Sequence, residues 1–130
     1  MIVVDASVVV TALADDGPDG DAARSRLTGA RLVAPHLIDL EVVSAWRRMV
    51  ATGAIDERRA DLARGDLLAL RVTRVPHTGL LERCWELRSN LTVYDAAYVA
   101  LAEQMGVPLV TADMRLAAAP GRRCVVEVLS

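Results

Sequence analysis

The stretch "TVYDAAYVALAEQMGVPLVTAD" (92–113) places a helical pattern directly before a short apolar one, with an acidic residue in each. Thr92 is a favourable N-cap residue and Gly106 a favourable terminator, so the pattern predicts a helix over Thr92–Met105. The apolar residues that follow predict a buried strand over Pro108–Thr111. This stretch therefore predicts one helix–strand unit of an α/β fold.

The same alternation continues through the rest of the chain. Four more stretches predict short strands: Ile2–Asp5, Leu32–Ala34, Val72–Val75 and Cys124–Leu129. Helical patterns separate them: Ala6–Ala14, a short helix through Ala22–Leu27, His36–Thr52, 55–70, Gly79–Ser89 and one turn at Leu116–Ala119. Strands that alternate with helices predict a three-layer α/β/α sandwich around a mostly parallel five-stranded sheet.

Two local expectations can be tested against the structure. The segment "DDGPDGD" (15–21) has the composition of a loop. In the helix predicted over 55–70, the spacing of Leu62, Leu67 and Leu70 predicts that all three face inward.

Length and composition limit the class of protein. With 130 residues, 53% of them hydrophobic, the chain is long enough for a single domain spanning 1–130 and too apolar for a disordered protein. The net charge of −2 excludes a basic field over the whole surface, although a basic face beside an acidic site remains compatible with it. Cys84 and Cys124 fit no metal-binding spacing, and we expect reduced thiols. No signal peptide or membrane-spanning run is recognisable, so we expect a cytoplasmic protein.

Acidic residues gather where a parallel sheet places its ligands. Asp5 ends one predicted strand and Asp113 follows another, whereas Glu41 lies roughly one turn inside its predicted helix and Asp95 lies in the first turn of its own. Ligands of such sheets bind beyond the carboxyl ends of the strands, so we expect the four carboxylates to converge there. Two carboxylates about 4 Å apart repel by roughly 4 kcal/mol at an effective dielectric constant near 20, so such a cluster requires a cation or raised pKa values. An all-oxygen set suits Mg²⁺ or Mn²⁺ better than zinc.

Helix capping is the alternative explanation for three of the four acids. Asp5 can cap the helix at Ala6, Asp95 can complete a capping box with Thr92, and Asp113 can cap the turn that follows it. Glu41 lies too far inside its helix to cap it and has mainly apolar neighbours. Asp39 competes with Glu41 for a site role, but we expect it on the solvated first turn of the helix.

Taken together, these motifs resemble those of PIN-domain ribonucleases of the VapC toxin type. "VVDASVVV" (3–10) resembles the opening strand of that family with its D-x-S, and "EVVSAWRR" (41–48) resembles its E-x-x-N/S helix, with Ser44 at the fourth position. "LTVYDAAYVALAEQMGVPLVTADMRL" (91–116) resembles the longest family signature, Y-D-A-x-Y-x-x-L-A followed by T-x-D.

The resemblance implies more than the patterns do by themselves. It implies strand order 3-2-1-4-5, which makes Asp5 and Asp113 neighbours. It also implies metal-dependent cleavage of RNA by the toxin of a type II toxin–antitoxin pair, with a cognate antitoxin as partner and a homodimer as the usual assembly. In that interpretation Asp5, Glu41, Asp95 and Asp113 bind one or two Mg²⁺ or Mn²⁺ ions. Asp5 and Asp95 are then the best direct ligands, and Glu41 or Asp113 is the candidate base.

Other polar residues near the acids have candidate supporting roles. Ser7, Ser44 and Thr111 carry hydroxyls near the acidic motifs, and Ser7 and Thr111 are suited either to orienting a carboxylate or to local backbone bonding. Arg47, Arg48 and Arg115 are candidate contacts to RNA phosphates. Tyr94 and Tyr98 flank Asp95, and packing in the core is one expectation for both.

Competing functions lack the residues that they need. A haloacid-dehalogenase-type phosphatase requires a second acid two residues after Asp5, but Ser7 stands there. Phosphatases of this type, receiver domains and P-loop NTPases also normally use a lysine, and the chain has none. The alternative that remains is a catalytically silent PIN-like module that binds RNA or a protein partner.

Overall fold

In the computed structural model, which describes residues 1–129, five short strands form one parallel sheet. The strands are β1 (Ile2–Val4), β2 (Leu32–Pro35), β3 (Val72–Val75), β4 (Leu109–Thr111) and β5 (Val126–Val128). Their order in the sheet is β3-β2-β1-β4-β5, and every adjacent pair is parallel. The predicted fold class and the strand order are therefore confirmed.

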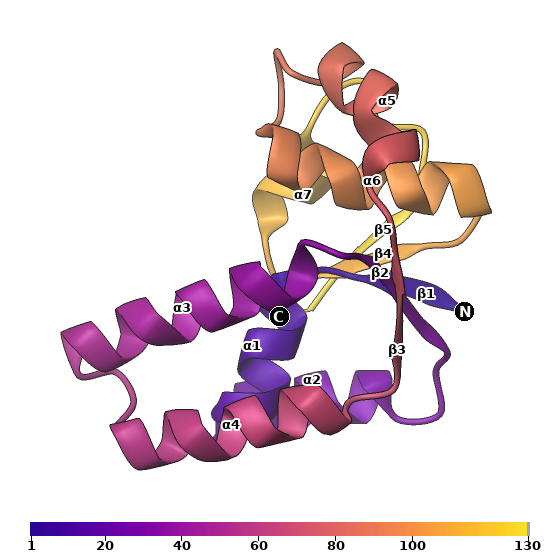
Figure 1. Cartoon of the computed structure of the whole chain (residues 1–130). Helices are drawn as coiled ribbons and strands as arrows, with labels where there is room; N and C mark the ends of the chain where they lie inside the picture. Colours follow the sequence, from indigo (N-terminus) through magenta and orange to yellow (C-terminus); the bar gives the residue numbers. More distant parts are fainter. Residues whose placement is uncertain (130) are drawn as a thin grey trace.

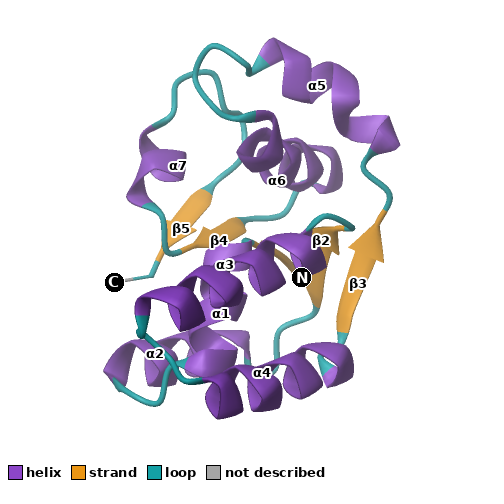
Figure 2. Cartoon of the chain, turned by 60° about the vertical axis from the view of Figure 1, so that its left-hand side comes forward, coloured by secondary structure: helices purple, strands orange, loops and turns teal. Residues whose placement is uncertain are grey.

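Helices cover both faces of this sheet. One face carries α1 (Ala6–Ala14), α2 (Pro18–Leu27), α3 (Ile38–Thr52) and α4 (Glu57–Ala69). The other carries the 3-10 turn η1 (Thr78–Leu80), α5 (Leu81–Glu86), α6 (Val93–Met105) and α7 (Met114–Ala118). Figure 2 shows the sheet between the two groups, and Figure 1 shows α3 and α4 projecting together to one side.

Small and β-branched side chains let the layers approach closely. Val3 and Val4 in the central strand are fully buried, and α6 packs against β1 and β2 through a continuous buried run from Ala96 to Ala102. Alanine at this helix surface removes bulk between helix and sheet, so the backbones can come close. Trp46 fills the space between α3 and α1, and its indole N–H donates to the carbonyl of Val10 at 3.3 Å.

Two local predictions are wrong in part. The loop predicted over 15–21 ends early, because α2 begins at Pro18, a residue well suited to the first helical position, followed by acids in the first turn. Leu62 is 57% exposed, and α4 instead packs inward through the smaller Ala60 and Ala63 together with Leu67. Alanines therefore form much of the buried face of α4.

The sheet register determines which residues meet at the carboxyl edge. Val4 of β1 lies beside Val110 of β4, and the backbone N–H of Asp5 donates to the carbonyl of Val110 at 2.9 Å. Asp5 and Thr111 therefore leave the sheet side by side. Both cysteines are free and buried, as expected. Over residues 1–129, no helix has the length and apolar character needed to span a bilayer.

Candidate active site

Asp5 is the most buried of the acidic residues predicted for the site. Its side chain lies where β1 gives way to α1, and only 6% of its surface is exposed. The hydroxyls of Ser7 and Thr111 both donate to the same oxygen, Oδ2, at 2.6 and 2.8 Å. Burial raises the pKa of Asp5; the two hydroxyls oppose this rise, and the charge of Asp113 adds to it. Asp5 occupies the N-cap position of α1 without a side-chain capping hydrogen bond, so capping does not explain it.

Ser7 and Thr111 also tie the turn after β4 to α1. The Ser7 hydroxyl accepts from the backbone N–H of Ala112 at 3.0 Å, and the Thr111 hydroxyl accepts from that of Asp113 at 3.0 Å. Each hydroxyl therefore holds the Asp5 carboxylate and the following turn at once. Of the two roles considered for these residues, orientation of a carboxylate is the one that this geometry supports for both.

Glu41 reaches the same edge from the first turn of α3. Its Oε1 accepts a hydrogen bond of 2.6 Å from the hydroxyl of Tyr98, a fully buried residue of α6. Burial raises the pKa of Glu41; the Tyr98 hydrogen bond opposes this, and the charges of Asp5 and Asp95 reinforce it. Burial and the neighbouring carboxylates also raise the pKa of Tyr98, so this hydroxyl stays protonated and remains a donor.

Asp39, the competitor of Glu41, is engaged elsewhere. Its carboxylate forms a two-pronged ion pair with Arg74 of β3, at 2.6 and 2.9 Å. An acid so paired serves to anchor α3 to the sheet. Asp39 is therefore separate from the site, as expected. It is not simply solvated, however, because Arg74 binds its carboxylate.

Asp95 and Asp113 complete the acidic edge from two different elements. The backbone N–H of Asp95 donates to the capping hydroxyl of Thr92 at 3.1 Å, which confirms the predicted N-cap. Burial raises the pKa of Asp95, and the charges of Asp5 and Asp113 add to that rise. Asp113 caps α7 by accepting from the backbone N–H of Arg115 at 2.9 Å, as the capping alternative expected.

Arg115 gives Asp113 a different electrostatic state from the other three acids. Its guanidinium binds both carboxylate oxygens, with the closest contact at 2.7 Å, and this lowers the pKa of Asp113. The arginine side chain is itself 83% exposed, so it lies over the outer rim of the acidic edge. Asp113 thus has a lowered pKa, whereas Asp5, Glu41 and Asp95 have raised ones.

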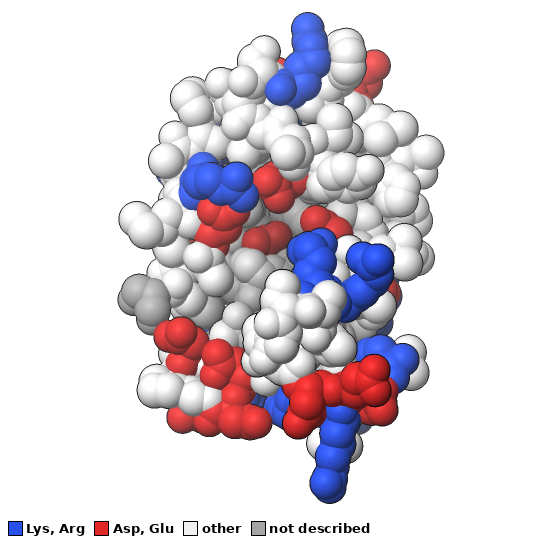
Figure 3. Space-filling model, turned by 90° about the vertical axis from the view of Figure 1, so that its left-hand side faces the viewer, with Lys and Arg blue, Asp and Glu red and all other residues white. Residues whose placement is uncertain are grey.

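The four acids lie close to one another at the carboxyl edge of the sheet. Figure 3 shows acidic side chains inside a depression of this face, with basic side chains on its borders. The mutual effects on their pKa values express the same proximity. Within residues 1–129, however, no three His, Cys, Asp or Glu side chains already form a metal-holding group. The donor set is all oxygen and carries excess negative charge, so its chemistry fits Mg²⁺ or Mn²⁺.

The remaining predicted residues lie on α3. Ser44 and Arg48 line a groove that begins beside Glu41, and Arg48 donates to the Ser44 hydroxyl at 3.1 Å. Arg47 lies further from the acids, in a separate groove between α3 and α4. The structure therefore gathers Ser7 and Thr111 with the acids and leaves Ser44, Arg47 and Arg48 outside the acidic hollow.

Tyr98 is the site residue that the sequence reasoning missed. It was expected in the core, and its ring is fully buried, but its hydroxyl holds Glu41. A position one helical turn after Asp95 shares its helix face, and this spacing is the signal that could have identified it. Tyr94, in contrast, is 65% exposed, so its packing in the core was a wrong expectation.

Comparison with known proteins agrees with this fold. The model of the PIN domain family matches residues 2–122. Ribonuclease VapC9 of Mycobacterium tuberculosis is 48% identical over 132 residues, covering 99% of this chain and 98% of the relative. Ribonuclease VapC1 of the same species is 47% identical over 128 residues, covering 98% of this chain and 96% of the relative.

A solved structure extends the likeness to the fold. The crystal structure of Mycobacterium tuberculosis VapC20, described as a toxin that cleaves the sarcin-ricin loop, superposes with a TM-score of 0.72 at 18% identity. It covers 96% of this chain and 98% of that one, and at this identity the likeness is one of fold. The match to the family model and the near-complete coverage at 47–48% identity mean that the chain belongs to the PIN-domain family, in its VapC group.

Proposed function

We propose that this protein is a Mg²⁺- or Mn²⁺-dependent endoribonuclease that acts as the toxin of a toxin–antitoxin pair. The observation that carries the proposal is the state of Asp5. It is a buried carboxylate held by two neutral hydroxyls, with further acids beside it and no arginine or lysine bound to it among residues 1–129. A buried negative charge of this kind is unfavourable unless a cation joins it.

In this proposal Asp5 and Asp95 are direct ligands of the ion, and Glu41 and Asp113 bind it directly or through water. The bound ion supplies a water of lowered pKa and offsets negative charge on the phosphate as the phosphodiester bond is hydrolysed. The carboxylate oxygens of this chain supply the hard donors that such an ion requires.

The other residues of the site fix the geometry of these acids. Ser7 and Thr111 hold the Asp5 carboxylate through Oδ2, which orients its other oxygen. Tyr98 holds Glu41 through Oε1. A glutamate whose pKa is raised by burial is a stronger proton acceptor than an exposed one, so we assign Glu41 as the group that accepts the proton of the attacking water.

The arginines on the borders of the hollow are the proposed contacts for RNA. Arg115 lies over Asp113 at one side, and Arg48 lies along the groove at the other. Arginine binds phosphate in a two-pronged geometry, so these positions suit the backbone on either side of the cleaved bond. Arg47 is proposed as a more distant phosphate contact.

The proposed partners are a cognate antitoxin and a second copy of the chain, in the cytoplasm. Support for the antitoxin comes from the membership in the VapC group and from a groove of about 430 Å³ between α3 and α4. Val43, Trp46 and Val50 give this groove an apolar floor, and Glu57, Asp61 and Arg64 border it. An amphipathic helix is the type of segment that such a groove accommodates.

An RNA-cleavage assay with EDTA, Mg²⁺ and Mn²⁺ arms tests the proposal. The wild type should cleave in the presence of either ion and stop in EDTA, and Asp5→Asn should be inactive in every arm. The same assay on Asp39→Asn provides the matched control, because Asp39 lies two residues from Glu41 but is bound to Arg74. Cleavage that persists in EDTA and in Asp5→Asn would overturn the proposal.

The catalytically silent RNA- or protein-binding module is the second candidate function. A titration with millimolar Mn²⁺, followed by calorimetry and by the melting temperature, separates the two. The absence of both a heat signal and a shift of the melting temperature would favour the silent module.

A further inference from the structure

A groove leads away from the acidic hollow along α3. It has a volume of about 320 Å³ and is lined by Leu37, Leu40, Glu41, Ser44, Arg48 and Tyr94. Glu41 lines this groove and also lies close enough to Asp5 and Asp95 for their charges to act on it, so the groove begins at the acidic residues. A polymer bound across the acids would therefore extend into the groove.

The exposed side chains of this groove are of three chemical kinds. Tyr94 presents an aromatic ring that is 65% exposed, and Leu40 beside it is 78% exposed. Arg48 supplies a positive charge, and the hydroxyl of Ser44 supplies a polar group between them. An aromatic face, an aliphatic side chain and a cation are the groups by which proteins hold an unpaired nucleotide.

Tyr94 is placed for this purpose by the same turn that places Asp95. Thr92 caps α6 and fixes its first turn, so the ring of Tyr94 lies on the residue directly before an acid of the site. Its neighbour in the fold, Tyr98, is fully buried and holds Glu41. The exposed ring of Tyr94 therefore has no role in packing the core.

Within residues 1–129 Arg48 has no carboxylate partner, whereas several arginines elsewhere in the fold do. Arg59, Arg74 and Arg83 each bind a carboxylate. Arg48 donates instead to the neutral hydroxyl of Ser44 at 3.1 Å, and in the described part of the chain it forms no ion pair. A cation whose only partner is a neutral hydroxyl, in the groove that Glu41 also lines, is available to a phosphate group.

We propose that this groove is a subsite for one unpaired nucleotide next to the cleaved phosphate, whose base stacks on Tyr94 against Leu40 and whose outer phosphate meets Arg48. The inference rests on the proposed nuclease function and specifies its substrate as RNA that is unpaired at the cleavage position. A base inside a duplex is stacked on both faces, so it cannot also stack on Tyr94.

Binding of an RNA probe by three variants tests this subsite. The probe is a single-stranded oligoribonucleotide of about ten residues with one 2-aminopurine, titrated against protein that carries Asp5→Asn, in Mg²⁺. Tyr94→Ala should weaken binding about tenfold, as expected for the loss of one stacked base, whereas Tyr94→Phe should stay within about twofold. Trp85→Ala is the matched control, because Trp85 is 61% exposed but lies on α5 outside the groove.

Two further measurements sharpen the test. Arg48→Gln should reduce the slope of log affinity against log salt by about one phosphate contact. The same RNA annealed to its complement should bind Tyr94→Ala and Tyr94→Phe equally. Equal affinity of these two variants for the single strand would overturn the subsite.

The competing occupant of the groove is a second copy of the chain. If Tyr94→Ala lowers the mass of the protein in solution and leaves RNA binding unchanged, the groove is an interface between copies and the subsite is overturned. Failure of the nuclease proposal has a different signature: the wild type then cleaves no RNA, whereas the difference between Tyr94→Ala and Tyr94→Phe in binding persists.

Discussion

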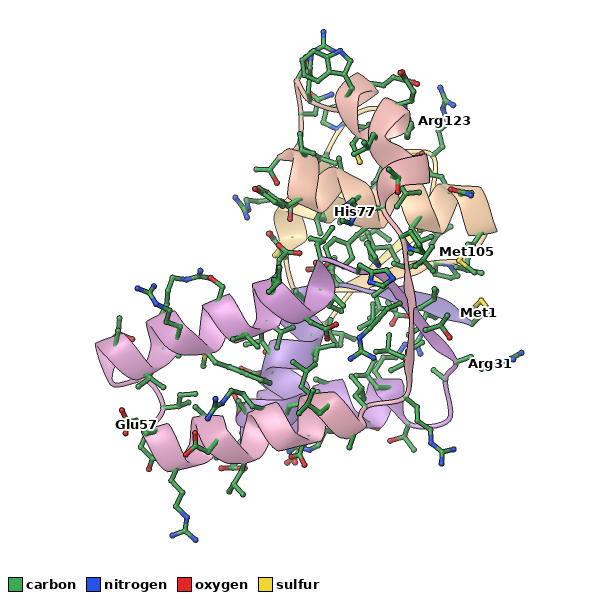
Figure 4. The ribbon with its side chains drawn as sticks, in the orientation of Figure 1. Met1, Arg31, Glu57, His77, Met105 and Arg123 are labelled. Carbon is green, nitrogen blue, oxygen red and sulfur yellow. The ribbon has the colours of Figure 1, made fainter. Side chains whose placement is uncertain are left out.

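Helix α6 carries an acidic residue near each end, Asp95 in its first turn and Glu103 in its last, and the surroundings shift the pKa values of the two in opposite directions. At its last turn, Glu103 accepts two hydrogen bonds from Arg83, at 2.7 and 3.1 Å, and a third from the backbone N–H of Arg123. Burial alone would raise the pKa of Glu103, but these donors lower it overall. Figure 4 shows Met105 and Arg123 labelled at this end, away from the projecting pair of α3 and α4.

At the first turn of α6, the balance is reversed. Burial and the neighbouring acids raise the pKa of Asp95, and Glu41 and Asp5 share this state. The hydroxyls of Ser7 and Thr111 donate to Asp5 and that of Tyr98 donates to Glu41, and these contacts orient a carboxylate without neutralising it. The difference teaches that an arginine neutralises the acid at the structural end of α6, whereas hydroxyls hold Asp5 and Glu41 without neutralising them; Asp113, which Arg115 binds beside the site, is intermediate between the two.

Removal of a hydroxyl-held acid should have the largest effect. Glu41→Gln is expected to lower the rate of RNA cleavage at least about 100-fold, because it removes a proton acceptor and a candidate ligand. Asp39→Asn, which breaks the pair with Arg74, should leave the rate within about twofold while lowering the melting temperature. Equal loss of cleavage in both variants would remove the distinction between the two kinds of acid.

Removal of the hydroxyl alone tests whether orientation matters. Tyr98→Phe should weaken Mn²⁺ binding about 10- to 100-fold in calorimetry, because Glu41 loses the donor that holds Oε1. Tyr94→Phe is the control, because its ring is exposed and no hydrogen bond joins it to Glu41 in the described residues. Unchanged Mn²⁺ affinity in Tyr98→Phe would show that the hydroxyl is only a core contact.

The arginine-held end should respond in stability rather than in activity. Glu103→Gln is expected to lower the free energy of unfolding by about 1 to 3 kcal/mol, the scale of hydrogen bonds to a charged group. Urea denaturation measures this, and cleavage should remain within about twofold. Because the pKa of Glu103 is lowered, its contribution is present at neutral pH and lost as pH falls through that lowered value.

The pH dependence of stability that comes from Asp5, in the candidate active site, should have the opposite sign. Because the pKa of Asp5 is raised, the folded protein binds more protons than the unfolded chain between the usual and the raised values, so stability falls as pH rises through that range. In EDTA at neutral pH, Asp5→Asn should therefore raise the melting temperature by a few degrees. A lower melting temperature would contradict the view that this carboxylate is uncompensated.

Arg115 pairs with an acid of the candidate site, Asp113, and its substitution should have the smallest effect on stability and activity. Its pair with Asp113 is exposed, so Arg115→Gln should leave the melting temperature unchanged. The KM for RNA should rise a few-fold, and the salt dependence of binding should decrease by about one contact. An unchanged KM and salt slope would assign Arg115 to the cap of α7 alone.

The sequence was sufficient for the alternation of elements and for the acidic edge, because both follow from local patterns. Strand ends place Asp5 and Asp113, and the caps at Thr92 and Gly106 bound α6 as predicted. The strand order came from the family resemblance, because no local pattern states which strands are neighbours. Leu62 was assigned inward because a leucine periodicity cannot reveal that Ala60 and Ala63 form the buried side of α4.

The support of the acids was less predictable than the acids themselves. The hydrogen bond from Tyr98 to Glu41 spans 57 residues, and that from Thr111 to Asp5 spans 106. Such contacts depend on how α3, α6 and β4 pack, so a sequence pattern can indicate the hydroxyl but not its partner. The contact between Arg115 and Asp113 is different, because the two residues are only two positions apart. A contact of this kind can be predicted from the local sequence.

The two hydroxyls that donate to Oδ2 of Asp5 also determine at what stage of synthesis and folding the site is assembled. Ser7 is available as soon as α1 forms, but Thr111 arrives only after β4 has paired with β1, with nearly the whole chain already synthesised. A growing polypeptide that ends before β4 contains Asp5, Glu41 and Asp95 without the strand that aligns them. The site is therefore assembled only after a segment 106 residues beyond Asp5 has been synthesised and has joined the sheet, so Asp5, Glu41 and Asp95 are not sufficient to assemble it.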